Sequence, residues 1–197
     1  DKISSGEVFL NGKPINIKSP RQAIKNGIAM VNEDRRQYGL VLGRSIHDNV
    51  SLVNMNKYTS SGLINDKKIT DDVEKMRKLL QIKIAGENVE AGTLSGGNQQ
   101  KVVLAKWLVG DVKVLILDEP VRGIDVGAKA EIHRLMSEFA REGMGIIMIS
   151  SELPEIIGMS DRVIIMQEGI MQGTLEREEV TQEKIMKLAT RGVGKNE

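Results

Sequence analysis

The chain is 197 residues long, which suits one domain able to bury a sizeable core. It has 40% hydrophobic and 28% charged residues, and its net charge of +1 provides no basic field of the kind that binds nucleic acid. It has no cysteine, in agreement with a reducing compartment, and no apolar run of the ~20 residues that a membrane span needs. No signal peptide heads the sequence, so we expect any membrane contact to go through a partner.

The N-terminal part predicts a hairpin followed by a short helix. Within residues 6–17, two apolar runs flank Asn11-Gly12, a strong signal for a tight turn between two strands. Ser19 followed by Pro20 predicts a capped helix start.

An apolar stretch, residues 28–31, then predicts a strand. It runs into the charged segment NEDRR, residues 32–36. From the residues alone, this segment is a solvated run of charges at a strand end.

The stretch 38–91 is predicted to be helical and less regular. Thr70 or Asp71 is expected to cap a helix in it. The apolar side of that helix is expected to carry Val73, Met76, Leu79 and Leu80. His47 has no evident catalytic partner nearby and His133 falls in a different helix, so we interpret both as structural or exposed.

The segment TLSGGNQQK is predicted to be a loop that opens a helix. The hydroxyl of Ser95 can accept a backbone N–H of the first turn, and the lack of a Cβ at Gly96 and Gly97 allows another group to approach closely. Asn98 and Gln99 add side-chain amides. Such a helix start presents unpaired N–H groups and the positive end of the helix dipole, which suits an anion. The alternative is a glycine-rich turn before an ordinary core helix.

Some twenty positions on, a second motif indicates phosphate chemistry. Residues 114–117 form a short apolar run, typical of a strand buried on both faces, and the run ends in Asp118 and Glu119. Ligands of open α/β sheets bind at such strand ends. Asp118 fits an acid that holds Mg²⁺, and Glu119 fits a general base for an attacking water. The alternative is a strand that exits into a polar turn, but the order of the two motifs favours nucleotide chemistry.

The C-terminal part continues the alternation of helices and strands. Residues 128–141 predict an amphipathic helix and residues 145–149 another buried strand. Residues 162–175 predict a last hairpin, and Thr181 is expected to cap a final helix. The inward side chains of that helix are expected to be Ile185, Met186 and Leu188.

Taken together, these motifs resemble the ABC-type ATPases. Residues 94–101, 115–120 and 122–129 resemble the signature motif, the Walker B strand and the D-loop. The forms LSGGNQQK, RGIDVGAK, NEDRR and SSELPE are similar to the second, C-terminal ATPase domain of the tandem-domain subunits of bacterial ribose, galactose and xylose importers. The resemblance covers about residues 6–188. It implies an α/β fold with a P-loop NTPase-like sheet core and a small helical subdomain, and ATP and Mg²⁺ as cofactors.

The resemblance also implies a domain organisation. Residues 1–37 would be the hairpin and first strand of the ATPase core, and residues 38–92 the helical subdomain that meets the permease. Residues 93–190 would carry the signature helix, Walker B, D-loop and switch, and residues 191–197 a tail.

The same resemblance assigns roles to single residues. It makes Glu119 catalytic and Asp118 the metal ligand. The implied nucleotide-contacting residues are Ser95, Gly96, Gly97, Asn98, Gln99, Glu33, Asp125 and Ser151. Glu33 stands where the family carries the Q-loop glutamine, and Ser151 stands where most members carry a switch histidine. Because serine cannot carry a positive charge, hydrolysis at this domain's own site is expected to be weak.

One motif of the family is missing from the sequence. No GxxxxGK[ST] loop occurs, so nothing here cradles the β- and γ-phosphates. In the family that loop precedes the hairpin at residue 6, so the chain resembles an N-terminally truncated domain. The strand of that loop lies between the strands at 145–149 and 162–167, whose edges are therefore expected to be unpaired here. The chain alone is expected to bind MgATP poorly and not to hydrolyse it.

The function implied is an ATPase that powers sugar import, peripheral on the cytoplasmic face of the cell membrane. Its partners would be the first ATPase domain of the parent chain, a transmembrane permease and, indirectly, a sugar-binding protein, with no nucleic acid. The loop at Ser95 would serve ATP held by the partner domain, giving an asymmetric pair of sites. Glu33, Ser151 and the missing loop favour an alternative, a non-catalytic nucleotide-binding and interaction module. A third possibility, an ABC-type ATPase acting on DNA or ribosomes, is disfavoured by the near-neutral charge.

Overall fold

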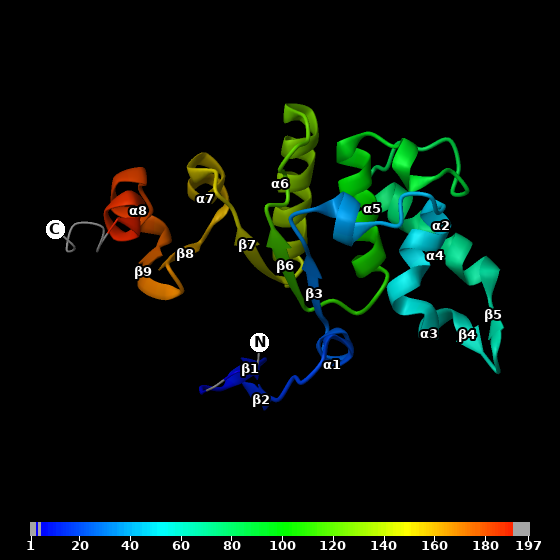
Figure 1. Ribbon diagram of the computed structural model, residues 1–197, viewed down its shortest axis with the longest axis horizontal. Helices are drawn as coiled ribbons and strands as arrows, with labels where there is room; N and C mark the ends of the chain where they lie inside the picture. Colours follow the sequence, from blue (N-terminus) through cyan, green and yellow to red (C-terminus); the bar gives the residue numbers. More distant parts are fainter. Residues whose placement is uncertain (1–2, 4, 191–197) are drawn as a thin grey trace. The chain divides into compact units, whose positions relative to one another are not determined.

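The structure is a computed structural model that describes residue 3 and residues 5–190, in which helices and strands alternate (Figure 1). The chain divides into two compact units, Asp1–Met148 and Ile149–Glu197, and each is described by itself. Among the described residues, no helix has the length and apolar character needed to cross a lipid bilayer. The predicted boundaries at residues 37 and 92 stay predictions, and the predicted tail, 191–197, lies outside the described residues.

The first unit begins with the predicted hairpin. Strands β1 (Val8–Leu10) and β2 (Lys13–Ile15) pair antiparallel. The two turn residues, Asn11 and Gly12, have φ angles of 51° and 72°, the left-handed pair that matches the twist of a two-residue hairpin. The hairpin prediction is confirmed.

Helix α1 (Pro20–Lys25) follows as predicted. The Ser19 hydroxyl accepts the backbone N–H of Gln22, and Pro20 occupies the first turn, where its missing N–H is not needed. After the helix, Gly27 has a φ of +82° and turns the chain into β3 (Ile28–Val31).

The central sheet has the order β3-β6-β7 (Figure 1). Strand β6 (Val114–Asp118) runs parallel to β3 with Ile28 opposite Val114. Leu115 and Leu117 are fully buried, whereas Val114 and Ile116 on the other face are half-buried. The prediction of burial on both faces is therefore met on one face only.

Strand β7 (Gly145–Ile149) is a correction, because it was predicted to be buried. Its residues alternate between half-buried and exposed, and Ile147 is 51% exposed. The reason is its place at the end of the described strand order, where β6 is its one neighbour. The expected unpaired edge at 145–149 is therefore present among the described residues.

Between the sheet strands lies a mainly helical segment. Its elements are η1 (Arg35–Gly39, a π-helical turn), α2 (Ile46–Ser51), η2 (Leu52–Asn54), α3 (Met55–Tyr58), β4 (Thr59–Ser60), β5 (Leu63–Ile64), α4 (Asp66–Leu79) and η3 (Ala91–Thr93). The small hairpin of β4 and β5 was not predicted.

The predicted start of α4 is wrong. Asn65 caps the helix by accepting the backbone N–H of Lys68, which places the start before Thr70 and Asp71. Thr70 lies inside the helix and donates to the Glu87 carboxylate at 3.1 Å.

The predicted apolar side of α4 is partly correct. Val73, Met76 and Leu80 are buried as predicted, together with Ile69. Leu79 is 45% exposed, because it turns away from the buried stripe.

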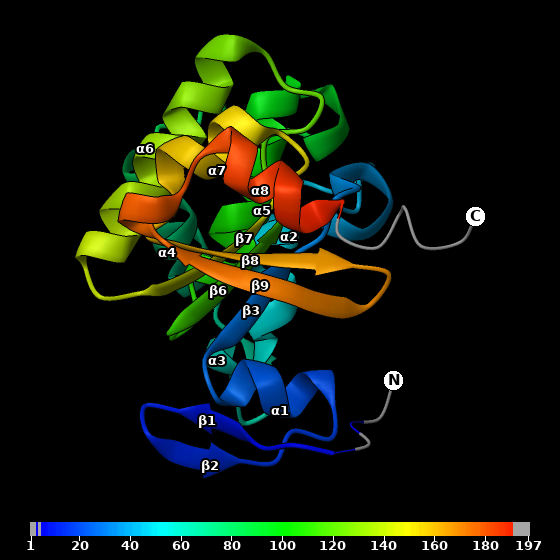
Figure 2. The same ribbon diagram turned by 90° about the vertical axis from the view of Figure 1, so that its left-hand side faces the viewer.

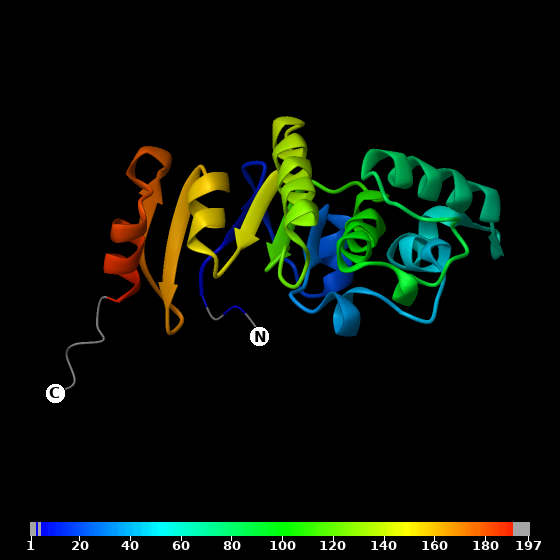
Figure 3. The same cartoon turned by 90° about the horizontal axis from the view of Figure 1, so that it is seen from above.

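Helix α5 (Gly96–Leu108) is the centre of the first unit and packs against α2, α4 and α6 (Val126–Arg141) (Figure 3). Its buried apolar residues include Val102, Val103, Leu104 and Ala105. The predicted helix over 128–141 is confirmed as part of α6. Its apolar side chains Ile132, Leu135, Met136 and Phe139 are all buried, as an amphipathic helix requires.

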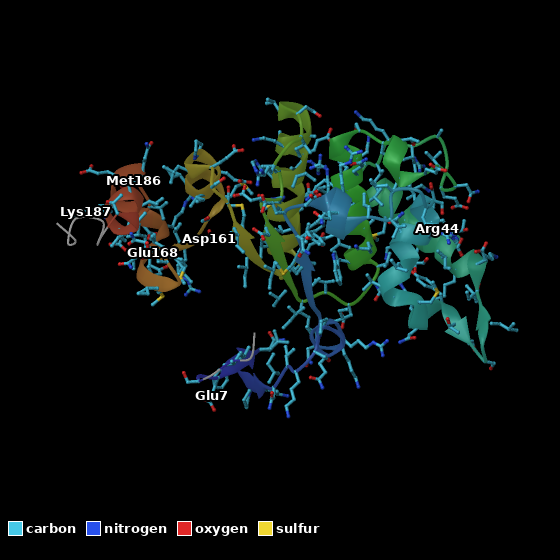
Figure 4. All side chains as sticks on the ribbon, viewed as in Figure 1. Glu7, Arg44, Asp161, Glu168, Met186 and Lys187 are labelled. Atoms are coloured by element: carbon cyan, nitrogen blue, oxygen red, sulfur yellow. The ribbon has the colours of Figure 1, made fainter. Side chains whose placement is uncertain are left out.

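The second unit contains α7 (Leu153–Met159), β8 (Arg162–Gln167), β9 (Ile170–Glu176), η4 (Arg177–Glu179) and α8 (Gln182–Ala189). The predicted hairpin forms, and α8 packs on it (Figure 2). Thr181 caps α8 as predicted, and Ile185 and Leu188 pack inward. Met186 was predicted to point inward but is 45% exposed (Figure 4), because the turn of the helix carries it away from Ile185.

Candidate functional site

The acidic strand end predicted at Asp118 and Glu119 lies at the carboxyl edge of the sheet. Asp118 is the last residue of β6 and is half-buried. Because β3 and β6 are parallel neighbours, the segment after β3 emerges at the same edge. Glu119 has a φ of +47°, and its carbonyl accepts the backbone N–H of Arg122 at 3.1 Å. Such a left-handed conformation is costly for a non-glycine residue and occurs both in tight turns and at functional sites.

Glu33 follows β3 and forms an ion pair with Arg122, which follows β6. Both side chains are partly exposed, at 47% for Glu33 and 65% for Arg122. The pair offsets the negative charge that Glu33 would otherwise add near a phosphate. Sequence reasoning missed Arg122, although opposite charges after two neighbouring strands were a signal that could have identified it.

Arg35 links the two strand-end segments a second time. Its Nη1 donates to the carbonyl of Arg122 at 2.9 Å, and its Nη2 donates to the carbonyl of Gly123 at 3.1 Å. Its Nε is buried with no hydrogen-bond partner. Burial, and then the neighbouring charge of Arg36, lower the pKa of Arg35 from its ordinary value. The side chain therefore keeps a partly desolvated charge whose hydrogen-bond acceptors are neutral carbonyls.

The loop at Ser95 opens α5 as predicted. The Ser95 hydroxyl accepts from the side-chain amide of Asn98 at 3.1 Å and, more weakly, from its backbone N–H at 3.5 Å. The side-chain carbonyl of Asn98 accepts the Lys83 N–H at 2.9 Å. The N–H groups of Gly96 and Gly97 belong to the first turn, where a helix offers no internal acceptor. They remain the donors of this helix start that suit an anion.

Gln99 points into the domain, and its predicted nucleotide contact stays a prediction. Its side chain is 4% exposed and donates to the carbonyl of Ala91 at 3.2 Å, while its backbone N–H donates to Ser95. The backbone N–H and the side-chain amide of Gln99 each make a hydrogen bond inside the domain.

Gly97 is also engaged inside the domain. A Cβ built on it would lie 2.5 Å from the Cβ of Ala128 on α6. The close approach predicted at this glycine is therefore made by a helix of the same chain.

Asp125 caps α6, since its Oδ1 accepts the Ala128 N–H at 2.9 Å. The predicted nucleotide contact of Asp125 stays a prediction.

Ser151 lies in the second unit and is exposed. Next to it, the Ser150 hydroxyl donates to the buried carboxylate of Glu155 and accepts the Glu152 N–H at 3.0 Å. Within the first unit, the predicted residues lie at the end of β6, on the loops after β3 and β6 and at the starts of α5 and α6.

The carboxylate of Asp118 suits a magnesium ion that takes its other ligands from a nucleotide and water. Among the described residues, no three histidine or acidic side chains cluster as a ready-made metal site. Mg²⁺ is commonly held by one or two carboxylates together with substrate phosphates and water. The half-buried Asp118 fits that kind of site.

Two buried lysines fasten α5 on different sides. Lys101 pairs with the carboxylate of Glu131 on α6 and donates to the Gln81 carbonyl at 3.1 Å. The hydrogen bond from Lys101 lowers the pKa of Glu131. Lys106 donates to the carbonyl of Gly39 at the end of η1, and burial lowers the pKa of Lys106. The orientation of the Ser95 loop therefore depends on both α6 and η1.

The family is evident from comparison with known proteins. A family model described as ABC transporter matches residues 1–122. A putative ribose/galactose/methyl galactoside import ATP-binding protein of Rhizobium etli is 59% identical over 98% of this chain. The ribose import ATP-binding protein RbsA of Oceanobacillus iheyensis is 53% identical over 98%. This chain spans only 37% and 39% of these two relatives.

Solved structures share the fold. A nucleotide-free ATP-binding cassette from an ABC transporter superposes with a TM-score of 0.75 at 20% identity, over 95% of this chain and 78% of that one. For cbiO1 of Clostridium perfringens, part of an ABC transporter complex, the TM-score is 0.73 at 28% identity, over 93% and 70%. The chain belongs to the ABC transporter family.

Proposed function

We propose that this chain is part of the ATP-hydrolysing subunit of a sugar importer and that its Ser95 loop acts on ATP held by a partner ATPase domain. One observation carries the proposal. The glycine-rich start of α5 lies against the loop that follows the acidic end of β6, with Arg35 in contact with both. Oriented N–H donors such as those at this helix start stabilise the charge that develops on a transferring phosphoryl group.

The residues have separate roles in this proposal. The N–H groups of Gly96 and Gly97 donate to the γ-phosphate of the partner's ATP. Asp118 holds Mg²⁺, which neutralises developing charge on the phosphates when bound, and Glu119 accepts a proton from the attacking water. Both belong to this domain's own site, which is the weaker one because Ser151 replaces a charged switch residue.

The choice of a sugar importer is supported by relatives that are named for ribose and galactose import. In this proposal the helical segment 38–92 docks on a transmembrane permease, which receives sugar from an external binding protein. The subunit is then peripheral on the cytoplasmic face of the membrane.

A second candidate function is a non-catalytic module that lends its Ser95 loop to the partner. The ion pair of Glu33 with Arg122 favours it, because the carboxylate expected to act like the Q-loop glutamine already has a partner.

ATP turnover of the proposed full-length subunit, with and without permease, tests the function. Gly96→Asp is expected to abolish most turnover, because it places charge against the phosphate, and Glu119→Gln is expected to leave much of it. Equal losses, or a milder loss from Gly96→Asp, would show that the two sites are assigned wrongly. Turnover that is fully unchanged in Glu119→Gln would favour the non-catalytic module, because this domain's own site would then contribute nothing to hydrolysis.

The 197-residue chain alone provides a separate test by calorimetric titration with MgATP. We expect no binding in the micromolar range, because no phosphate loop is present in the sequence.

A further inference from the structure

Arg35 connects its own segment to two others in the first unit, the loop carrying Arg122 and Gly123 and the start of α5. It starts η1, directly after the charged segment that follows β3. Its two terminal nitrogens donate to the consecutive carbonyls of Arg122 and Gly123, in the loop between Glu119 and α6. The third contact is with Gly96, at the first position of α5, where a Cβ would lie 2.7 Å from Nη2 of Arg35.

The guanidinium suits this position because its donors form a rigid, planar fork. Two parallel donors meet two carbonyls that are adjacent in the chain, and this fixes both the distance and the direction of the loop. Gly123 has a φ of +67°, and both Arg122 and Gly123 are exposed, so the fork adds to the ion pair of Arg122 with Glu33 in confining the loop. A lysine ammonium, which is a point charge on a flexible stem, cannot hold the loop in the same way.

The contact with Arg35 explains why position 96 is a glycine, without reference to any bound ligand. The guanidinium occupies the space where a side chain at position 96 would begin, and the Gly123 carbonyl lies 3.3 Å from that point. A side chain at position 96 therefore displaces Arg35 from its carbonyls before it meets any phosphate. Loss of function in Gly96→Asp would then be partly a loss of the Arg35 contact.

We propose that Arg35 is a positioning residue that sets the start of α5 against the loop carrying Arg122 and Gly123. It acts through Gly96 and these carbonyls and does not itself contact the nucleotide. The effect of Arg35 on ATP turnover rests on the function proposed above. Its effect on how firmly the loop is held does not. These two segments carry the N–H donors of Gly96 and Gly97 and the cap of α6, so their relative position decides how these donors are presented to the partner's nucleotide.

Attraction to neighbouring charged side chains does not explain the position of the Arg35 guanidinium. The nearest charged neighbours of Arg35 are Asp34 and Arg36. The Asp34 carboxylate accepts the backbone N–H groups of Arg36 and Gln37, at 2.9 and 3.0 Å, and so caps η1. Desolvation of the guanidinium costs free energy, which its hydrogen bonds to the Arg122 and Gly123 carbonyls offset in part while its Nε stays without a partner.

The first experiment measures amide hydrogen exchange in the 197-residue chain without nucleotide. Its variants are Arg35→Lys and Arg35→Met, with Arg36→Met as the matched control on the same turn. The reporter is the Arg122 amide, which donates to Glu119. We expect both Arg35 variants to raise its exchange rate by at least about tenfold, the effect of losing a hydrogen bond to a charged group. The control should leave it unchanged, and strand amides of β3 and β6 should stay protected in all variants.

Two outcomes of the exchange experiment overturn the proposal. Arg122 exchange that stays at the unmodified level in Arg35→Met shows that the fork does not hold the loop. An Arg122 amide that stays fully protected from exchange in Arg35→Lys shows that a positive charge alone holds the loop. Protection lost equally in β3 and β6 would mean general unfolding, and the comparison is then repeated with Arg35→Gln at lower temperature, where the same two outcomes decide.

The second experiment measures steady-state ATP hydrolysis by the proposed full-length subunit. Both Arg35 variants should lower kcat by about tenfold or more, with KM for MgATP changed less than about threefold, since positioning affects the transition state more than nucleotide affinity. Arg36→Met should match the unmodified subunit. Gly96→Ala combined with Arg35→Met should lose no more than the worse single variant, because both act on one contact. An unchanged kcat in both Arg35 variants contradicts the proposed effect of Arg35 on turnover. Absence of turnover in the unmodified subunit contradicts the proposed function instead. In that case the exchange experiment alone tests whether Arg35 holds the loop.

Discussion

Gly97 of α5 and Ala128 of α6 mark a point where two helices touch at backbone distance, since a Cβ on Gly97 would lie 2.5 Å from the Cβ of Ala128. Atoms attached directly to the backbone cannot move aside as a flexible side chain does. The second glycine of the loop is therefore required by packing, whereas the first leaves room for the side chain of Arg35.

Gly97→Ala is expected to destabilise the first unit by about 1–3 kcal/mol, the usual cost of overpacking a tight contact. Urea unfolding followed by fluorescence gives the measurement, because the single tryptophan of the chain, Trp107, lies on α5. Gly96→Ala is the matched control and should cost less, since the group it meets is the end of a flexible side chain.

Adding Ala128→Gly to Gly97→Ala should recover part of the lost stability, because it removes the Cβ that causes the clash. The recovery will be incomplete, since a glycine inside a helix costs about 0.5–1 kcal/mol. If the double variant is no more stable than Gly97→Ala alone, the clash is not the cause of the loss.

Lys101 and Glu131 should respond unequally to truncation. The Lys101 side chain is 3% exposed and that of Glu131 is 37% exposed, so removing the carboxylate leaves a buried ammonium with the Gln81 carbonyl as its remaining partner. Glu131→Ala should therefore cost about 1–3 kcal/mol, the penalty for a buried polar group that loses its partner. Lys101→Met should cost clearly less, and equal unfolding free energies for the two variants would contradict this account.

The same pair predicts a pH dependence of stability. Lys101 lowers the pKa of Glu131 from its ordinary 4.5, so the folded state binds fewer protons than the unfolded state near that pH. The stabilisation is therefore present above pH 4.5 and is lost as the pH falls through the lowered pKa. Between pH about 5 and 3, the unmodified chain should lose stability more steeply than Glu131→Gln. Parallel curves of unfolding free energy against pH would show that the pair does not contribute.

Strand β7 predicts self-association of the 197-residue chain. Ile147 is 51% exposed on a strand with one described neighbour, and an unpaired apolar edge is a template for pairing between molecules. Ile147→Lys should lower the average mass measured by light scattering at high concentration. Leu79→Lys, at a 45% exposed apolar position on helix α4 where no strand edge is present, is the control and should have less effect.

Local rules predicted much of the fold because the signals lie within a few residues of one another. The turn at Asn11-Gly12 and the caps at Ser19, Ser95 and Thr181 each depend on a side chain and a backbone group in the same turn. The start of α4 failed because Asn65 and Thr70 both suit a cap and only the fold decides between them. Burial of β7 failed because an apolar sequence does not reveal how many neighbours a strand has.

The candidate site was predictable in its motifs and not in its contacts. Glu33, Asp118 and Ser95 stand in recognisable segments, and the structure puts those segments at strand ends and a helix start. The hydrogen bond from Arg35 to the Arg122 carbonyl joins positions 87 residues apart, and no periodicity or spacing indicates such a pair. The inward turn of Gln99 likewise depends on Ala91, which a one-dimensional pattern does not place beside it.

The burial of Lys101 and Lys106 gives the protein two intrinsic reporters of its own motion. An amine-reactive reagent modifies only an accessible, uncharged amine. Exposed lysines therefore react quickly, whereas Lys101 and Lys106 react only after the protein opens locally around them. Lys101 becomes reactive when α5 separates from α6, and Lys106 when α5 separates from η1. The order in which mass spectrometry detects the two modifications therefore tells which side of the helix loosens first, in a protein that carries no mutation and no attached probe.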